Sequence, residues 1–185
     1  RALKTAGEQE AVATLQNLLL RTDAEAEYSA GLFDDPGALI RYLRARHWNM
    51  QAAEDMIRCT ARWRKAFGFE DLISGKLKAV VEVENATGKL YTRGFDRRGR
   101  PIFYMRPARE NTFDPEGSLK HLVYCMERTV ACIERRQTRL LEKCGEHFDD
   151  NGELGKLIVL ADFRGYSLAQ AINASTAREV LRIFQ

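Results

Sequence analysis

The feature that most restricts the fold of this chain is a change in hydrophobic periodicity near residue 88. Before this point, apolar residues recur at spacings of three and four, which indicates short amphipathic helices over about 8–70. After it, short apolar runs flank one long helical stretch. We therefore expect an α/β protein with an N-terminal helical bundle in residues 1–75 and a partial βαβ mixed-sheet domain in residues 76–185.

The order of elements in the second part predicts the pairing of its strands. Strands are expected at Lys89–Phe95, Pro101–Met105 and Lys156–Asp162, with a turn at 96–99 whose final glycine supplies a left-handed backbone angle. The long helix is expected over 117–143. Because a strand, a helix and a strand follow one another, the strands that flank the helix should pair in parallel.

Short local signals predict where the helices begin and end. Asp35 before Pro36 indicates a helix start, Asn49 can cap the next helix, and Gly68 can end it. Thr176 and Glu179 form a possible capping box for a last helix at 177–185.

Apolar spacing also predicts which faces are buried. The helix after Pro36 should bury Leu39, Ile40, Leu43 and His47, and the following one Met56, Thr60, Trp63 and Phe67. The long helix should bury Leu119, Leu122, Met126, Val130, Ile133, Gln137 and Leu140. The continuous apolar run Leu157–Ala161 is typical of a strand buried on both faces of a sheet.

Composition excludes some classes of protein. The net charge of the 185 residues is only +3, although basic residues gather in two blocks, at 41–65 and 89–109. These blocks lack the interleaved aromatic residues of an RNA-binding motif, so we expect no nucleic-acid partner. No run of 18 apolar residues occurs, and the first residues lack the apolar segment of a signal peptide. Since the chain does not begin with methionine, we expect it to be a fragment or a processed form.

The four cysteines are expected to be free thiols in a reducing compartment. Cys125 and Cys132 would lie about 10 Å apart on one helix, which is too far for a disulfide. Two His–Cys pairs, His121 with Cys125 and Cys144 with His147, have the residue types that bind zinc as two cysteines and two histidines. They are separated by about 28 Å of helix, so we expect no metal site.

Three motifs carry a specific resemblance. The first is LIRYLRARHWNM at residues 39–50, followed by Trp63-Arg64; the second is DRRGRPIFY at 96–104; the third is DFRGYS at 162–167. The residues, order and separation of these motifs resemble those of the CRAL-TRIO (Sec14-like) family of lipid-binding proteins. The resemblance covers about 35–185 and stops before the family's later strands and its gate helix. It implies the small N-terminal helical module of that family, followed by the first half of its lipid-binding domain.

The resemblance implies a lipid carrier that works without cofactor or catalytic residue. Family members enclose one lipid in an apolar cavity and move it between membranes, so the expected partners are a lipid and, transiently, a membrane. The implied location is the cytoplasm, with peripheral membrane association. The residues agree with a non-enzymatic role, because the sequence contains no G-x-S-x-G, no H-E-x-x-H and no phosphate-binding loop.

The same resemblance assigns five candidate ligand-binding residues. Arg46 matches an arginine that binds the headgroup in phosphatidylinositol-transferring members, although a surface ion pair is an alternative role. The positions that line the pocket in phosphatidylcholine carriers match Thr92, Phe103, Leu157 and Val159. The family's tyrosines are absent at the first two of these positions, and its strand hydroxyls are absent at the last two, so phosphatidylcholine is disfavoured as the ligand. A phosphoinositide, a sterol, a tocopherol-like or retinoid molecule, or another apolar ligand stays open.

Two other functions remain as alternatives. The chain could be a regulatory or scaffold module of the same fold that no longer transports lipid, within a larger signalling protein. Nucleic-acid binding through the basic blocks is a third possibility, from a different class.

Overall fold

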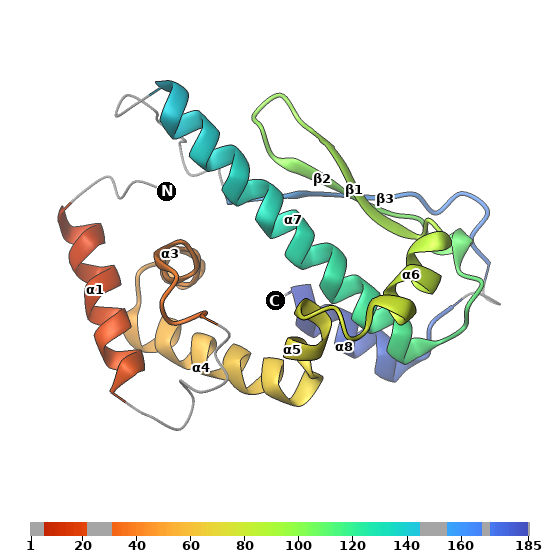
Figure 1. Cartoon of the computed structure of the whole chain (residues 1–185), viewed down its shortest axis with the longest axis horizontal. Coiled ribbons are helices and arrows are strands. Elements are labelled where there is room, and N and C mark those ends of the chain that lie inside the picture. The colour runs from red at the N-terminus through yellow and green to blue at the C-terminus, as the bar shows by residue number, and fades with distance from the viewer. Residues whose placement is uncertain (1–5, 22–30, 145–154, 168–170, 185) are drawn as a thin grey trace. The chain divides into compact units, whose positions relative to one another are not determined.

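The computed structural model describes residues 6–21, 31–144, 155–167 and 171–184. The chain divides into two compact units, Arg1–Ser74 and Gly75–Gln185, and each is described by itself (Figure 1). The first contains only helices among its described residues, and the second combines helices with a sheet. The expected class, a helical module followed by a mixed α/β domain, is confirmed.

The first unit is built from helices α1 (Ala6–Leu20), α3 (Pro36–Ala45), α4 (Met50–Phe67) and α5 (Phe69–Ile73). The sequence signals for their ends are confirmed. The Asp35 carboxylate accepts a hydrogen bond from the amide of Gly37 at 2.8 Å, and the Asn49 side chain accepts one from Ala52 at 3.0 Å. Gly68 ends α4 with a φ of 74°, a left-handed conformation that glycine adopts without strain.

Helices α1, α3 and α4 share one apolar core. Its buried members are Val12, Leu15, Leu19, Leu32, Phe33, Ala38, Leu39, Ile40, Leu43, Ala53, Ile57 and Ala61. Small alanines on α3 and α4 let the helix backbones approach closely, and the leucines and isoleucines fill the space between them.

Two predictions about buried faces in this unit were wrong. His47 lies beyond the end of α3 and is exposed, because the chain turns there with a φ of 52° at His47 and 64° at Trp48. The amide of Trp48 closes this turn by donating to the carbonyl of Leu43 at 2.7 Å. On α4 the buried stripe is Ala53, Ile57 and Ala61, adjacent to the predicted one. Trp63 and Phe67 stack on each other, with ring centroids 4.9 Å apart, and are only half-buried.

The second unit contains a three-stranded sheet in the order β1 (Leu90–Phe95), β2 (Pro101–Met105), β3 (Ile158–Ala161). Strands β1 and β2 form an antiparallel hairpin, whose turn has Gly99 at a φ of 84°. Strands β2 and β3 pair in parallel, so the predicted pairing across the long helix is confirmed.

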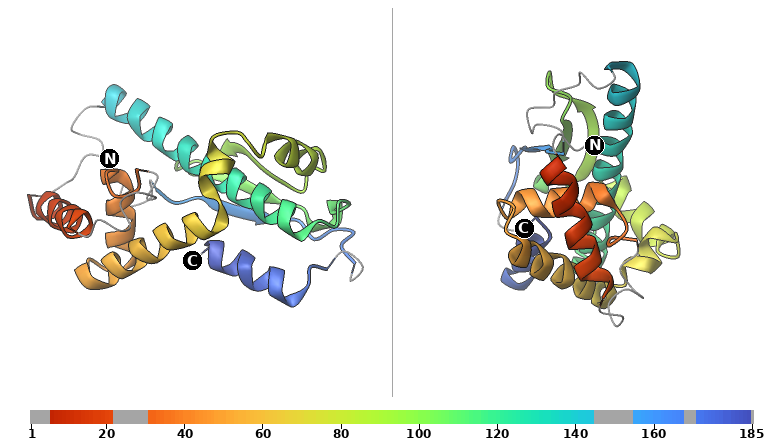
Figure 2. Two further views of the ribbon diagram at one scale, coloured as in Figure 1. Left: turned by 60° about the horizontal axis from the view of Figure 1, so that its bottom comes forward. Right: turned by 90° about the vertical axis from the view of Figure 1, so that its left-hand side faces the viewer.

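Helices α6 (Lys78–Ala86), α7 (Pro115–Cys144) and α8 (Ala174–Phe184) complete the unit, with a short 3-10 turn η1 (Pro107–Arg109). Helix α7 runs alongside the β1–β2 hairpin, with α6 and α8 packed against it (Figures 1 and 2). Among the helices that the structure describes, none has the length and apolar character needed to cross a bilayer.

The buried face of α7 differs from the predicted one. Leu122 and Ile133 are buried as expected, but Leu119, Met126 and Val130 are only half-buried. In their place the helix buries a row at every fourth position, Gly117, His121, Cys125, Thr129 and Ile133. The periodicity of strongly apolar residues does not reveal this row, because only Ile133 among its five members is strongly apolar. The side chains of Gln137 and Leu140 lie outside the described residues.

Two predictions near the C-terminus were also wrong. Strand β3 is an edge strand of this sheet and not a strand buried on both faces, since Val159 and Leu160 are 45% and 44% exposed. Helix α8 begins earlier than predicted, and its cap is Asn173, whose side chain accepts from the amide of Thr176 at 2.8 Å. Thr176 lies inside the helix and is buried.

Candidate functional site

A cavity of about 260 Å³ lies in the second unit, between the sheet, the first half of α7, the segment after β3, and α8. Its walls are mainly apolar, formed by Leu90, Met105, Pro107, Leu119, Leu122, Phe163, Tyr166, Ile172 and Val180. Pockets for small molecules usually measure roughly 300–1,000 Å³, so this cavity holds a short apolar segment and not a whole diacyl lipid. It suits a hydrocarbon chain or ring far better than a charged molecule.

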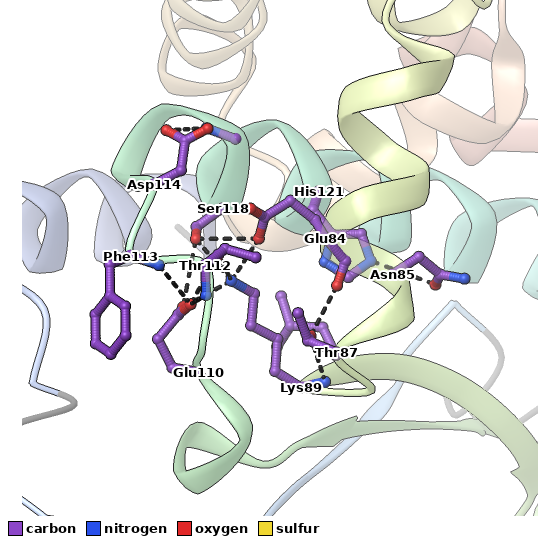
Figure 3. A network of polar contacts seen from close by, with 12 residues as sticks. Glu84, Asn85, Thr87, Lys89, Glu110, Thr112, Phe113, Asp114, Ser118 and His121 are labelled. Carbon is purple, nitrogen blue, oxygen red and sulfur yellow. Dashed lines mark hydrogen bonds and ion pairs between the residues drawn. The ribbon is translucent and has the colours of Figure 1, made fainter.

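One end of the cavity is polar. Lys89, Glu110 and Ser118 contribute to the lining there, and they belong to a buried network with Glu84 and Thr112 (Figure 3). The ammonium of Lys89 lies 2.6 Å from Glu110 Oε2 and 2.8 Å from Ser118 Oγ, and it also contacts the carboxylate of Glu84. Lys89 is only 5% exposed and Glu84 1%. Each charge is thus buried together with its partner, which is the condition under which buried charges are tolerated.

The network also ties the loop before α7 to the rest of the unit. Glu110 Oε1 accepts hydrogen bonds from the Thr112 amide at 3.0 Å, the Thr112 hydroxyl at 2.8 Å and the Phe113 amide at 3.2 Å. Burial opposes ionisation of Glu110, but the hydrogen bonds from Lys89 and Thr112 outweigh it and lower its pKa to about 2. Glu110 is therefore a carboxylate at neutral pH, and hydrogen bonds from Lys89, Thr112 and Phe113 hold it in place.

His121 and Cys125 extend the polar cluster along α7. Nε2 of His121 lies 3.3 Å from Cys125 Sγ and 3.4 Å from Asn85 Oδ1, and Nδ1 is buried without a hydrogen-bond partner among the described residues. Burial, helped by the nearby Lys89 ammonium, lowers the pKa of His121 to about 4. Burial raises the pKa of the Cys125 thiol to about 12. Both groups are therefore neutral at pH 7, and neither is prepared to act as a nucleophile or an acid–base pair.

The structure brings three of the five predicted ligand-binding residues into one row. Thr92 on β1 pairs in register with Phe103 on β2, and Phe103 pairs with Val159 on β3. Phe103 is fully buried and meets Phe184 of α8 edge-on, with ring centroids 6.4 Å apart. The Thr92 hydroxyl lies 2.5 Å from that of Thr129 on α7. Leu157 packs against the cluster of Phe103, Leu122 and Cys125. Thr92, Phe103 and Leu157 thus lie between the sheet and its helices, whereas Val159 is 45% exposed.

The same four residues do not line the cavity described above, whose walls lie nearer the start of β1 and the end of β2. Arg46 belongs to the first unit, where its backbone ends α3 and its side chain is exposed. The structure gives Arg46 no ion pair with another described residue, in contrast to Arg44, which lies 3.8 Å from Glu8. Both roles considered for Arg46, headgroup binding and a surface ion pair, stay predictions.

Sequence reasoning missed the polar end of the cavity. The sequence predicts Lys89 only as the first residue of a strand, and it does not single out Glu84, Glu110 or Ser118. No motif spacing marks them, because they lie on four separate segments that meet only in the folded chain. The single hint was that a lysine stands directly before an apolar strand.

The segment after β3 contributes the opposite wall. Asp162 forms a bidentate pair with Arg164 at 3.0 Å, and Gly165 turns the chain with a φ of 74°, so that Phe163 and Tyr166 meet edge-on. Hydrogen bonds from Arg164 lower the pKa of Asp162 to about 2.

Among the described residues there is no group of three or more His, Cys, Asp or Glu that could hold a metal ion. The Cys144–His147 pair considered above lies outside the described side chains.

Comparison with known proteins agrees with this geometry. The model of the CRAL/TRIO domain matches residues 85–185, and that of the CRAL/TRIO N-terminal domain matches residues 8–58. A CRAL-TRIO domain-containing protein of Schizosaccharomyces pombe is 38% identical over 92 residues, which is 50% of this chain and 9% of that protein.

Two other relatives cover more of the chain. The phosphatidylinositol transfer protein PDR17 of Saccharomyces cerevisiae is 32% identical over 157 residues, 79% of this chain and 39% of its own length. The Sec14 cytosolic factor of Schizosaccharomyces pombe is 30% identical over 116 residues, 55% of this chain and 39% of its own length. The chain thus spans at most about two fifths of the length of each of these relatives.

Proposed function

Because the chain belongs to the CRAL/TRIO family of lipid-binding and lipid-transfer proteins, we propose that this protein encloses a single lipid molecule and carries it between membranes. The observation that carries the proposal is the apolar cavity between the sheet, α7 and α8, which takes a segment of the hydrocarbon part of such a lipid. Each methylene moved from water into such a cavity gains about 0.8 kcal/mol, so burial alone can hold a lipid. The reaction is a binding equilibrium, and no bond is made or broken.

The phosphatidylinositol class is the cargo that we favour. Arg46 supports it, since an exposed guanidinium with no ion pair to a described residue is available for bidentate contact with a phosphate. The name of the PDR17 relative, a phosphatidylinositol transfer protein, points the same way. Phosphatidylcholine is disfavoured, because the Thr92 hydroxyl already faces Thr129 and the positions of Phe103, Leu157 and Val159 offer no side-chain hydrogen bond to a headgroup.

We also propose a cytoplasmic protein that meets membranes only transiently. Cys59, Cys125 and Cys132 are free thiols, which suits a reducing compartment, and one relative is named a cytosolic factor. An apolar neutral lipid is the second candidate cargo, supported by the apolar walls of the cavity.

Two neighbouring residues of α8 give a matched test. Val180 lines the cavity, whereas Leu181 is 61% exposed. Val180→Phe fills part of the cavity and should reduce uptake of fluorescent phosphatidylinositol from vesicles at least about tenfold, while Leu181→Phe should leave it unchanged. Overpacking of this kind costs about 1–3 kcal/mol of stability, so the melting temperature of each variant is measured beside uptake. Equal uptake by the folded Val180→Phe variant and the wild type would exclude this cavity as the lipid site.

A further inference from the structure

The tip of the β1–β2 hairpin and the adjacent part of α7 form a strongly basic surface segment of the second unit. We call this the hairpin-tip patch and define it by residues 93–100 and 134–139. It contains seven arginines and two carboxylates, a net charge of +5, whereas the whole chain carries only +3. The arginines are Arg93, Arg97, Arg98, Arg100, Arg135, Arg136 and Arg139. All but Arg100 and Arg136 are exposed.

Arg136 joins the two halves of the patch. Its guanidinium carbon lies 4.7 Å from the centroid of the Phe95 ring, at the end of β1. The same side chain covers Gly99, where an added Cβ would come within 2.5 Å of Arg136 Nε. The hairpin tip is therefore held against α7 by close packing, so the arginines of both segments belong to one preformed surface.

The two carboxylates of the patch, Asp96 and Glu134, balance only two of its seven arginines. Asp96 is bound to Arg100, with Nε at 2.8 Å from Oδ2, and it accepts the amides of Arg98 and Arg100 in shaping the turn. Hydrogen bonding to Arg100 lowers the pKa of Asp96, so it stays ionised and committed to that turn. Arg136 Nε is buried without an acceptor among the described residues, and this guanidinium forms no ion pair with them. The patch therefore keeps its net charge of +5 on a surface whose arginines are mostly exposed.

We propose that the hairpin-tip patch is the surface by which the protein docks on membranes rich in acidic phospholipids. This inference rests on the proposed lipid-transfer function, because a carrier must approach a bilayer to exchange its cargo. The cytoplasmic face of a membrane has a surface potential of about −30 mV, and each arginine or lysine near it contributes about a fivefold gain in partition. Phe95, 43% exposed beneath Arg136, supplies an apolar side chain at the level of the headgroups.

A nucleic acid is the other polyanion to consider. Proteins that bind single strands offer several aromatic rings on which successive bases stack. The patch has one aromatic residue, Phe95, and Arg136 already lies over its ring. The charge pattern without a stacking platform therefore favours a lipid surface.

Charge reversal at two exposed positions tests the proposal. Arg97→Glu with Arg98→Glu removes charge from the tip without touching the cavity, and Arg178→Glu with Arg182→Glu makes the same change of charge on α8. Membrane binding is measured by co-sedimentation with vesicles of phosphatidylcholine alone or of phosphatidylcholine with about 30% phosphatidylserine. Binding to a single-stranded DNA of about 20 nucleotides is measured separately. Uptake of fluorescent phosphatidylinositol from neutral vesicles is measured in parallel.

We expect the wild type to bind acidic vesicles and to release them in 1 M salt, where the Debye length falls to about 3 Å. The Arg97/Arg98 variant should bind them at least roughly thirtyfold less, because two positive charges are lost and two negative charges are added. The Arg178/Arg182 variant should lose much less. Uptake from neutral vesicles should be the same in all three proteins. Equal binding of the Arg97/Arg98 variant and the wild type to acidic vesicles would overturn the inference, as would tighter binding to the oligonucleotide than to the vesicles. Failure of the wild type to take up any lipid would instead overturn the proposed function.

Discussion

Lys89 Nζ lies 2.6 Å from Glu110 Oε2, at the polar end of an otherwise apolar cavity. The same ammonium contacts Glu84 on α6 and Ser118 on α7 (Figure 3). One lysine thus links α6, the start of the sheet, the loop at 110–113 and α7. The cavity wall at this end therefore depends on the charge of Lys89 and on its two carboxylate partners.

Replacing Lys89 should destabilise the protein strongly. Lys89→Met leaves the carboxylates of Glu84 and Glu110 in the interior without their cation, which typically costs about 3–5 kcal/mol. Lys78→Met is the matched control, because Lys78 is 75% exposed and lies 3.6 Å from Glu82 on the surface of α6. We expect the control to lose under about 1 kcal/mol. Urea unfolding measures both, and equal small losses would contradict a structural role for the buried network.

Stability should fall as the pH drops from about 6.5 to 4, and His121 should be a main cause. Burial lowers its pKa to about 4 in the folded chain, whereas an unfolded histidine titrates near 6.5. Within this window the unfolded state binds the additional proton, so the contribution of His121 is complete above about pH 6.5 and lost toward pH 4. The loss in the free energy of unfolding from this titration amounts to about 3 kcal/mol. Urea unfolding of the wild type and of His121→Gln at several pH values should show a shallower slope for the variant; parallel slopes would contradict the prediction.

Glu110 should act in a lower pH range. Its pKa is lowered from 4.5 to about 2, with the donors Lys89 and Thr112 outweighing the effect of burial. The carboxylate therefore stabilises the fold above about pH 4.5, and this contribution is lost as the pH falls toward 2. Thermal unfolding of the wild type and of Glu110→Gln between pH 5 and 2.5 checks this prediction. The two melting temperatures should converge at the acid end, and a constant difference would exclude ionisation of Glu110 as the cause.

Alanine should be tolerated less well at Gly99 than at Gly94. Both glycines have left-handed backbones, with φ of 84° and 73°, so alanine costs about 1–2 kcal/mol at either position. At Gly99 the new Cβ would also come within 2.5 Å of Arg136 Nε, whereas nothing lies within 4 Å at Gly94. We expect Gly99→Ala to lose about 1 kcal/mol more, because the Arg136 side chain must leave Phe95 to make room. Equal free energies of unfolding for the two variants would show that this contact adds nothing.

Removal of Arg46 tests the cargo. If its guanidinium binds a phosphoinositide headgroup, Arg46→Ala should lose about 1.5–3 kcal/mol, or roughly tenfold to hundredfold, in transfer affinity for phosphatidylinositol. Transfer of a labelled neutral lipid and the melting temperature should be unchanged, since the side chain is exposed. Vesicle transfer assays with both lipids give the answer. Equal transfer of phosphatidylinositol by variant and wild type would remove Arg46 from the site and favour a neutral cargo.

The sequence by itself determined the local structure and the fold class. Asp35, Asn49 and Gly68 mark helix ends because capping is a contact within a few residues of the chain. Gly99 marks the hairpin turn for the same reason, and the order of strand and helix patterns led to the parallel pairing of β2 with β3. These features depend on neighbouring residues in the sequence or on a regular spacing, so they can be predicted from the sequence alone.

Only the tertiary structure decided which residues face one another. The row His121, Cys125 and Thr129 is buried because α6 and the sheet lie over that side of α7, which no period of strongly apolar residues records. Val159 and Leu160 point to opposite faces of β3 and are both exposed, and a continuous apolar run does not show which elements cover each face of its strand. Glu84, Lys89 and Glu110 become one buried site only when the end of α6, the start of the sheet and the loop at 110–113 come together. The attraction that joins them acts through space and leaves no recognisable spacing in the sequence.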